Sequence, residues 1–193
     1  MTPVPRETAG VLDLFRAMVV EESERQNLVS PASMIEFDTR HVDDGVQLVP
    51  LGRPGSWCDV GSGAGLPGVV IAILTGEPMT LIEPRHLRAD FLRRVVATLD
   101  LNAEVVEAKV ERLSGSFDNI TARAVAETGK LFAMTEHLAH RGTRWILPKG
   151  RSAKKELEAA EQAWQGRFEL VPSRTSDEAM IMVAEDVRRR GKR

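Results

Sequence analysis

Two patterns of apolar residues alternate along most of the chain. Short apolar runs, typical of buried strands, occur at Trp57–Val60, Met79–Ile82, Ala103–Val106, Phe117–Thr121 and Thr143–Leu147. Apolar residues at helical spacing follow them, and predict helices over Val69–Leu74, Arg85–Leu99, Glu127–Leu138 and Ser152–Trp164. Such alternation builds βαβ units, so we expect a parallel sheet with helices on both faces.

The two ends of the chain follow other patterns. Apolar spacing predicts a helix from Glu7 to about Glu24, and Ser30-Pro31 is typical of the start of a second helix running to about His41. Asp43-Asp44-Gly45 and Gly52-Arg53-Pro54-Gly55 predict a loop after it. Near the C-terminus, Phe168–Val171 and Ala179–Val183 are expected to form a closing antiparallel pair.

These elements predict a single α/β domain over residues 1–193. Its expected parts are an N-terminal helical cap over residues 1–50, a core over residues 56–186 and a basic tail over residues 187–193. The chain is 42% hydrophobic and 28% charged, as expected of a folded globular domain.

Composition excludes several classes of protein. The single cysteine, Cys58, rules out an internal disulfide framework, a cysteine-based zinc finger and a CxxC redox motif. The four histidines form no HExxH pattern, and we expect no metal. The first 20 residues lack a basic start followed by an unbroken apolar core, so we do not expect them to be a signal peptide. No run approaches the roughly 20 apolar residues of a membrane span. We therefore expect a soluble, cytoplasmic monomer with no membrane partner.

The net charge of −2 is unevenly distributed. The last six residues carry five basic groups, and without them 21 basic residues face 28 acidic ones. A body of this kind can bind RNA only through local basic patches. The clusters that could serve are Arg85, Arg88, Arg93 and Arg94, then Arg141, Arg144, Lys149, Arg151, Lys154 and Lys155, and the tail.

The glycine-rich segment DVGSGAGLPG, residues 59–68, carries the clearest chemical signal. Gly61, Gly63 and Gly65 follow a predicted strand and open a predicted helix, the context in which such turns bind nucleotide-like cofactors. Glycine lets a ligand approach the backbone without a Cβ clash, and the helix N-terminus offers free N–H groups. The alternative is a purely structural βα turn.

Two acidic residues complete this pattern. Glu83 ends the next strand, 22 residues after Gly61, where a carboxylate can accept hydrogen bonds from both ribose hydroxyls. Asp59, just before the first glycine, suits the cationic S-adenosylmethionine better than the pyrophosphate of NAD or FAD. As alternatives, Glu83 caps the helix at Pro84-Arg85 and Asp59 hydrogen-bonds loop amides.

At this point the chain resembles a known family. DVGSGAGLPG, LIEPRHLRADFLRRV, TARAVA at residues 121–126 and LPKG at residues 147–150 are similar to motifs of the bacterial ribosomal RNA small-subunit methyltransferase G family. The resemblance covers roughly Asn27 to Gly150. It implies a class I methyltransferase fold and methyl transfer from S-adenosylmethionine to N7 of a guanine in 16S rRNA, near the decoding site. The implied partner is the small ribosomal subunit or its assembly intermediate.

The resemblance also implies cofactor contacts at Gly61, Leu66, Val110, Glu111 and Arg123. Guanine N7 has a free lone pair, so no base is needed and catalysis can rest on alignment. No catalytic residue is assigned, but Arg123 could orient the guanine.

Each of these residues has a structural alternative. Arg123 could be a surface arginine paired with Glu127. Lys149 could be a phosphate contact or a solvated loop lysine. Val110-Glu111 could be the start of a helix. Leu66 could simply fill the turn. Other functions also stay open: a methyltransferase acting on another RNA, a protein or a small molecule, an NAD-dependent reductase, or an RNA-binding module without activity.

Overall fold

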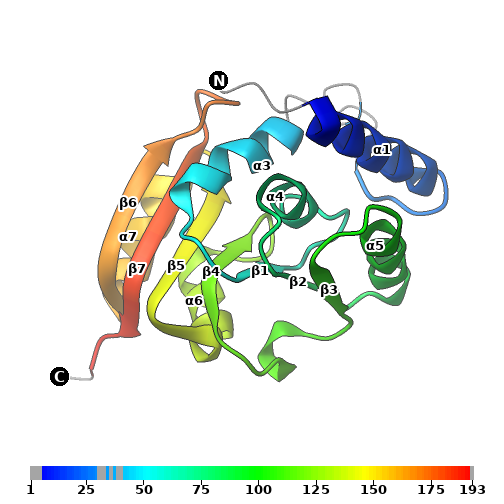
Figure 1. The fold of residues 1–193 in the computed structure, drawn as a ribbon. Coiled ribbons are helices and arrows are strands. Elements are labelled where there is room, and N and C mark those ends of the chain that lie inside the picture. Colours follow the sequence, from blue (N-terminus) through cyan, green and yellow to red (C-terminus); the bar gives the residue numbers. More distant parts are fainter. Residues whose placement is uncertain (1–5, 30–33, 35–36, 38–40, 192–193) are drawn as a thin grey trace.

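A computed structural model of the chain describes residues 6–29, 34, 37 and 41–191. Its centre is one seven-stranded sheet in the order β3-β2-β1-β4-β5-β7-β6 (Figure 1). β7 runs in the direction opposite to the other strands, so its pairings with β5 and β6 are antiparallel. The strands are β1 (Trp57–Val60), β2 (Met79–Ile82), β3 (Ala103–Val106), β4 (Phe117–Ala122), β5 (Ala139–Lys149), β6 (Trp164–Pro172) and β7 (Met180–Arg189).

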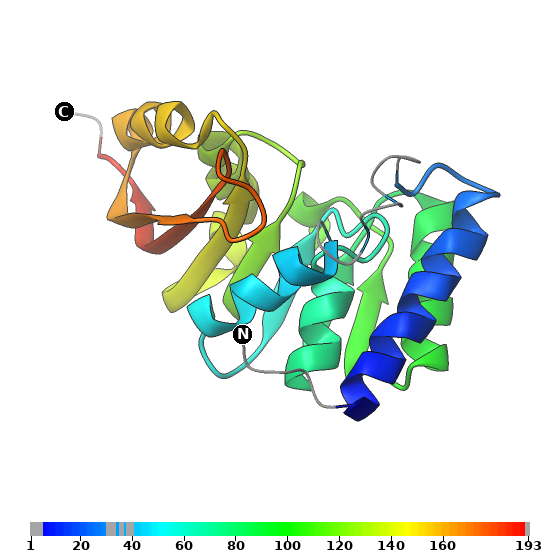
Figure 2. The ribbon, with the colours of Figure 1, turned by 90° about the horizontal axis from the view of Figure 1, so that it is seen from above.

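Helices pack on both faces of this sheet (Figure 2). The helices α1 (Arg6–Ser23), α3 (Asp43–Leu48), α4 (Gly68–Thr75) and α5 (His86–Thr98) share one hydrophobic core with one face. The other face packs against α6 (Thr128–Thr135), the 3-10 turn Glu136–Leu138 and α7 (Ala153–Ala163). No described helix is long and apolar enough to cross a membrane.

The predicted alternation of strands and helices is confirmed, and β1, β2 and β3 have the predicted bounds. β1 and β2 are buried at every position because helices cover both faces. The predicted antiparallel pair at the C-terminus is also confirmed, although both strands are longer than their apolar runs. Cys58 is buried in the middle of β1.

The prediction of a loop at Asp43-Asp44-Gly45 is wrong, since these residues begin α3. The start of the preceding helix at Ser30-Pro31 lies outside the described residues. Gly45 serves helix packing and not a turn, because a Cβ at this position would lie 2.6 Å from Cγ1 of Val70 on α4. The glycine therefore lets α3 approach α4 closely.

Replacing Gly45 by alanine should therefore lower the free energy of unfolding by about 1–2 kcal/mol, because the close contact forces α3 and α4 apart. Urea denaturation measures this change. Gly10→Ala in α1 is the matched control, since a Cβ there meets nothing within 4 Å. That control should raise stability by up to about 1 kcal/mol through helix propensity. Equal stabilities for the two variants would contradict the packing role.

The basic tail is also shorter than predicted. Val187 to Arg189 belong to β7, so the predicted boundary at residue 187 is wrong. Arg189 lies over the ring of Trp164 and pairs with Glu136 at 2.6 Å. Arg190 donates to the carbonyl of Glu161 at 2.7 Å. These partners are distant in the sequence, which is why the charge pattern alone predicted a basic tail.

Candidate functional site

The glycine-rich loop lies at the carboxyl end of β1, between β2 and β4. Gly61, Gly63 and Gly65 have φ angles of 70°, 56° and 86°, a region that residues with a Cβ rarely adopt. The amides of Gly61 and Ser62 donate to the carbonyl of Ile82 at 2.8 and 3.0 Å, which ties the loop to β2. The loop therefore has the backbone geometry that its sequence predicted.

Asp59 is buried beneath this loop, with 1% of its surface exposed. One carboxylate oxygen accepts the Gly68 amide at 3.2 Å, as the structural alternative expected. The other, Oδ1, is buried without a hydrogen-bond partner among the described residues. Burial raises the pKa of Asp59 from 3.8 to about 6. A buried acid with a spare oxygen can serve a cationic ligand.

Glu83 follows β2 and faces the glycine-rich loop. Its Oε2 accepts the amide of Gly63 at 2.9 Å, and its Oε1 accepts the amide of Arg85 at 2.9 Å. The predicted capping contact with Arg85 is thus present beside the contact with the loop. Because a carboxylate offers about four lone-pair sites, both oxygens keep capacity for further donors.

A groove of about 280 Å³ lies at the edge where the parallel strands end. It is lined by sequence neighbours of Asp59 and Glu83, but not by these two residues themselves, nor by Gly63 or Gly65. Val110 and Glu111 belong to a short 3-10 helix, Val110–Arg112, so the predicted structural alternative holds for their backbone. They nevertheless line the groove. Its lining also includes Val60, Gly61, Ile82, Pro84, Val125 and Lys130. Leu66 is absent from this lining and is buried in the hydrophobic core with α4.

A second, larger hollow of about 670 Å³ lies beyond the ends of β4 and β5. We call it the polar cleft. It is lined by Asp44 and Gln47 of α3, Arg123, Lys149 and the turn between β6 and β7. Ala126 lines both hollows, so they adjoin at the segment 123–126. Two ligands bound in these hollows would therefore meet at this segment.

Arg123 follows β4 at the edge of the polar cleft. Its Nη1 donates to Nδ1 of His41 at 3.0 Å and to Asp44 at 3.4 Å. Its partner is thus Asp44 of α3 and not the predicted Glu127. Burial lowers the pKa of Arg123 below the ordinary value for arginine, against the opposing effect of Asp44 and Asp59. The negative charge of Asp59 therefore acts on the Arg123 guanidinium.

Lys149 also lines the polar cleft, but its charge already has partners. Its Nζ donates to Glu156 at 2.8 Å and to the Ala126 carbonyl at 3.2 Å, and only 8% of its side chain is exposed. The prediction of a solvated loop lysine is therefore wrong. Its contacts hold the segment 123–126 next to α7.

One buried network at the polar cleft was missed by the sequence reasoning. Gln47 donates to Asp44 at 3.1 Å and to Ser173 at 3.1 Å, and it accepts the amide of Arg174 at 2.8 Å. Asp44 in turn accepts the hydroxyl of Thr175 at 2.5 Å. This network joins α3 to the turn after β6. No local signal could have found it, because its two sides are more than 120 residues apart.

His86, Asp90 and Glu107 form a further polar cluster near the end of β3. Their possible ligand atoms lie within 4.8 Å of one another. Arg93 donates to Asp90 at 2.5 Å and to Glu107 at 2.9 Å. Since Arg93 and His86 both contact the two carboxylates, we describe this cluster as an ion-pair network.

Comparison with known proteins shows which family the chain is similar to. A family model described as rRNA small subunit methyltransferase G matches residues 10–177. A ribosomal RNA small subunit methyltransferase G from Rhizorhabdus wittichii is 45% identical, over 98% of this chain and 90% of that protein. One from Sphingopyxis alaskensis is 42% identical, over 89% and 76%.

A solved structure extends the comparison to the fold. The M. jannaschii TYW2 structure, a complex with S-adenosylmethionine (AdoMet), matches with a TM-score of 0.61. The match covers 86% of this chain and 80% of that chain, at 12% identity. At this identity the similarity shows the fold alone, which is that of class I S-adenosylmethionine-dependent methyltransferases.

Proposed function

The chain belongs to the rRNA small subunit methyltransferase G family, and we propose that it transfers a methyl group from S-adenosylmethionine to N7 of a guanine in 16S rRNA. The observation that carries this proposal is the pair of adjoining hollows. One lies over the glycine-rich loop and the other is polar, and they meet at the segment 123–126.

The residues at the smaller groove fit S-adenosylmethionine. Gly61, Val110 and Glu111 line this groove, and the latter two can border the adenine. Gly63, Gly65 and Glu83 lie beside it. The glycines leave the loop backbone open to a ligand, and Glu83, although only 3% exposed, can accept from the ribose hydroxyls. The spare oxygen of Asp59 suits the positively charged amino acid part. Leu66 contributes through loop packing. When bound, this cofactor supplies an electrophilic methyl group on a sulfonium.

The polar cleft supports the other half of the proposal. Guanine N7 carries a lone pair and needs no deprotonation, so the protein has only to align N7 with the methyl carbon. Arg123 lies at the boundary of the two hollows and can donate to guanine O6. His41 and Asp44 hold its guanidinium in place, and are therefore positioning residues.

Methyl transfer to purified small ribosomal subunits tests this function. We expect labelled methyl from S-adenosylmethionine to enter 16S rRNA, and borohydride–aniline cleavage to identify 7-methylguanosine. Label that reaches protein or small molecules of a cell extract and survives ribonuclease would point instead to another substrate. Comparing naked 16S rRNA, assembly intermediates and mature subunits then identifies the particle recognised. Binding of NAD without binding of S-adenosylmethionine would favour a reductase.

The raised pKa of Asp59 predicts a pH dependence of cofactor binding. The carboxylate becomes protonated as the pH falls below about 6, which removes the charge that attracts the cationic cofactor. The Kd for S-adenosylmethionine, measured by calorimetry, should therefore rise about tenfold between pH 7 and pH 5. Asp59→Asn should bind more weakly at pH 7 and lack this dependence.

The raised pKa of Asp59 also makes the stability of the fold depend on pH, but in the direction opposite to that of cofactor binding. The folded protein holds this proton more tightly than the unfolded chain does, so the contribution of Asp59 is favourable at low pH. It is lost as the pH rises from 3.8 to about 6. For cofactor binding, a Kd for S-adenosylmethionine that does not change with pH in the wild-type protein would contradict the proposed role of Asp59.

A further inference from the structure

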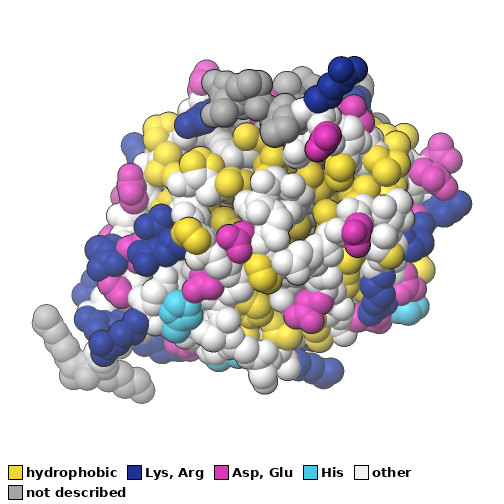
Figure 3. Space-filling view, viewed as in Figure 1, with side chains coloured by type: hydrophobic (Ala, Val, Ile, Leu, Met, Phe, Trp, Pro, Cys, Tyr) yellow, Lys and Arg dark blue, Asp and Glu magenta, His cyan; other side chains and the backbone are white. Residues whose placement is uncertain are grey.

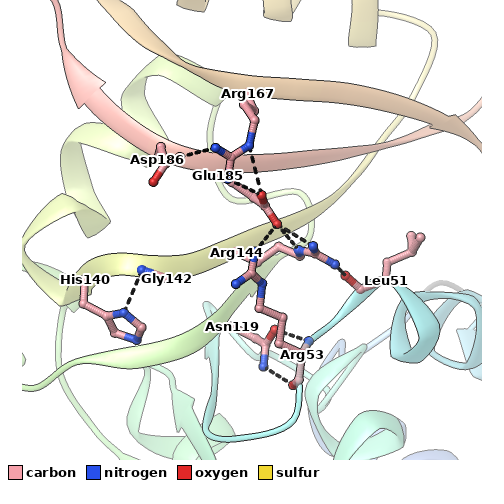
Figure 4. A network of polar contacts seen from close by, with 9 residues as sticks. All are labelled: Leu51, Arg53, Asn119, His140, Gly142, Arg144, Arg167, Glu185 and Asp186. Carbon is pink, nitrogen blue, oxygen red and sulfur yellow. Dashed lines mark hydrogen bonds and ion pairs between the residues drawn. The ribbon is translucent and has the colours of Figure 1, made fainter.

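Three arginines surround one carboxylate on the sheet face opposite α6 and α7 (Figure 4). The strand register pairs Arg144 of β5 with Glu185 of β7, and Glu185 with Arg167 of β6. Their side chains therefore lie in one row across three strands. Arg53, from the loop before β1, reaches the same carboxylate. We call these four residues the triple-arginine cluster.

The contacts within the cluster are short. Oε1 of Glu185 accepts Nη2 of Arg53 and Nε of Arg144, both at 2.6 Å, and Oε2 accepts Nη2 of Arg167 at 2.7 Å. These bonds, with that from Arg167 the strongest, lower the pKa of Glu185 to about 2. Arg167 also pairs with Asp186. Three guanidinium groups thus meet two carboxylates within the cluster, and Glu169 on the wall of the neighbouring hollow is a third carboxylate nearby.

The cluster is held rigidly by the surrounding backbone. Arg144 donates from Nη1 to the Leu51 carbonyl at 2.7 Å. The side chain of Asn119 accepts the Arg53 amide and donates to the Arg53 carbonyl, each at 2.8 Å. Nε of Arg53 is buried without a hydrogen-bond partner in the described part of the chain. Each guanidinium carries five N–H donors, more than these contacts use, and the spare donors suit an anion with several oxygens.

A hollow of about 470 Å³ opens beside the cluster. Its walls are Arg144, Arg167, Glu169 and Glu185 together with apolar residues that include Leu51 and Val171. Lys and Arg side chains gather over β6 and β7 at the left of the molecule, with acidic side chains among them (Figure 3). The hollow thus offers guanidinium groups beside an apolar wall, a combination that suits a phosphate and its sugar.

The position of the cluster links it to the polar cleft. Met180 and Ile181 of β7 line that cleft, and Glu185 lies four residues further along the same strand. At about 3.3 Å per residue, this spacing is roughly 13 Å. A strand of RNA can span this distance along the surface of the molecule.

We propose that the triple-arginine cluster binds a phosphodiester group of the RNA strand whose guanine enters the polar cleft. This inference rests on the proposed function for the identity of the RNA. The arginines supply affinity and set the register of the strand, whereas base recognition stays at the cleft.

Salt-dependent binding of a short, labelled single-stranded RNA of mixed sequence tests the inference by fluorescence anisotropy. Arg167→Gln should weaken binding and reduce the slope of log K against log salt by about 0.7, the value for one phosphate contact on a single strand. Glu169→Gln, which removes an exposed negative charge from the wall, should tighten binding. Arg25→Gln is the control, because Arg25 is similarly exposed and pairs with Glu21 and Glu22 of α1, the helix at the opposite side of the fold from β6 (Figure 1).

The outcomes separate this inference from the proposed function. The cluster is supported if Arg167→Gln changes the slope and Arg25→Gln does not, with the Kd for S-adenosylmethionine unchanged in both. An unchanged slope for Arg167→Gln, or the same change for Arg25→Gln, overturns it. If Arg167→Gln lowers the melting temperature, Glu169→Gln decides alone, and unchanged affinity overturns the inference. Wild-type protein that binds RNA but transfers no methyl to small subunits contradicts only the proposed function.

Discussion

Arg123→Gln should lower kcat for methyl transfer to small ribosomal subunits by about 10²–10³-fold. Glutamine lacks the charge and the planar fork that would hold the guanine beside the methyl group. The Kd for S-adenosylmethionine, measured at pH 8 where Asp59 is ionised, should change no more than about threefold, because the loss falls on alignment and not on cofactor binding. Single-turnover kinetics with labelled cofactor measures the chemical step.

Arg151→Gln is the matched control for this experiment. Arg151 lines the same polar cleft, but its side chain is 80% exposed and pairs with Glu178. Its loss should alter the KM for the subunit and leave kcat nearly unchanged. Arg123→Lys separates charge from geometry, since it keeps the charge without the fork. If Arg123→Gln retains wild-type kcat, Arg123 has no part in aligning the guanine.

Glu83→Ala should weaken binding of S-adenosylmethionine by about a hundredfold. The substitution removes the acceptor proposed for the ribose hydroxyls. It also leaves the amides of Gly63 and Arg85 without their carboxylate, so the glycine-rich loop loses its link to the end of β2. Calorimetric titration measures the affinity, and thermal unfolding reports the loss of loop contacts.

Glu104→Ala provides the control on the neighbouring strand. Glu104 is an exposed carboxylate of β3 that accepts the Thr80 hydroxyl at 2.9 Å, away from the groove. Its removal should leave cofactor affinity unchanged. Glu83→Gln keeps one acceptor oxygen and should give an intermediate Kd. Wild-type affinity in Glu83→Ala would remove this residue from the cofactor site.

Local errors in the prediction have identifiable causes. Asp43-Asp44-Gly45 has the composition of a turn, but the contact between Gly45 and Val70 makes it a helix–helix junction. The last basic residues look like a free tail, yet pairing of β7 with β6 continues to Arg189. In both cases a distant partner outweighed the local preference.

By itself, the sequence determined the parts of this protein that depend on neighbouring residues. Apolar periodicity is a local property, so it located the strands and helices of the βαβ units. The glycine-rich loop could also be predicted from the sequence, because its positive φ angles require glycine at defined positions. Glu83 was found at the end of the next strand for the same reason, since a short βαβ unit leaves little freedom in where that strand ends.

Only the tertiary structure decided the polar cleft and the triple-arginine cluster. The partners of Arg123 and Gln47 depend on how α3 docks against the sheet. The three arginines meet Glu185 only because β7 lies between β5 and β6. Contacts between residues this far apart follow from strand order and register, which spacing along the chain does not encode. The elements and the glycine-rich loop are therefore local properties, whereas the surfaces that we propose for RNA binding are products of packing.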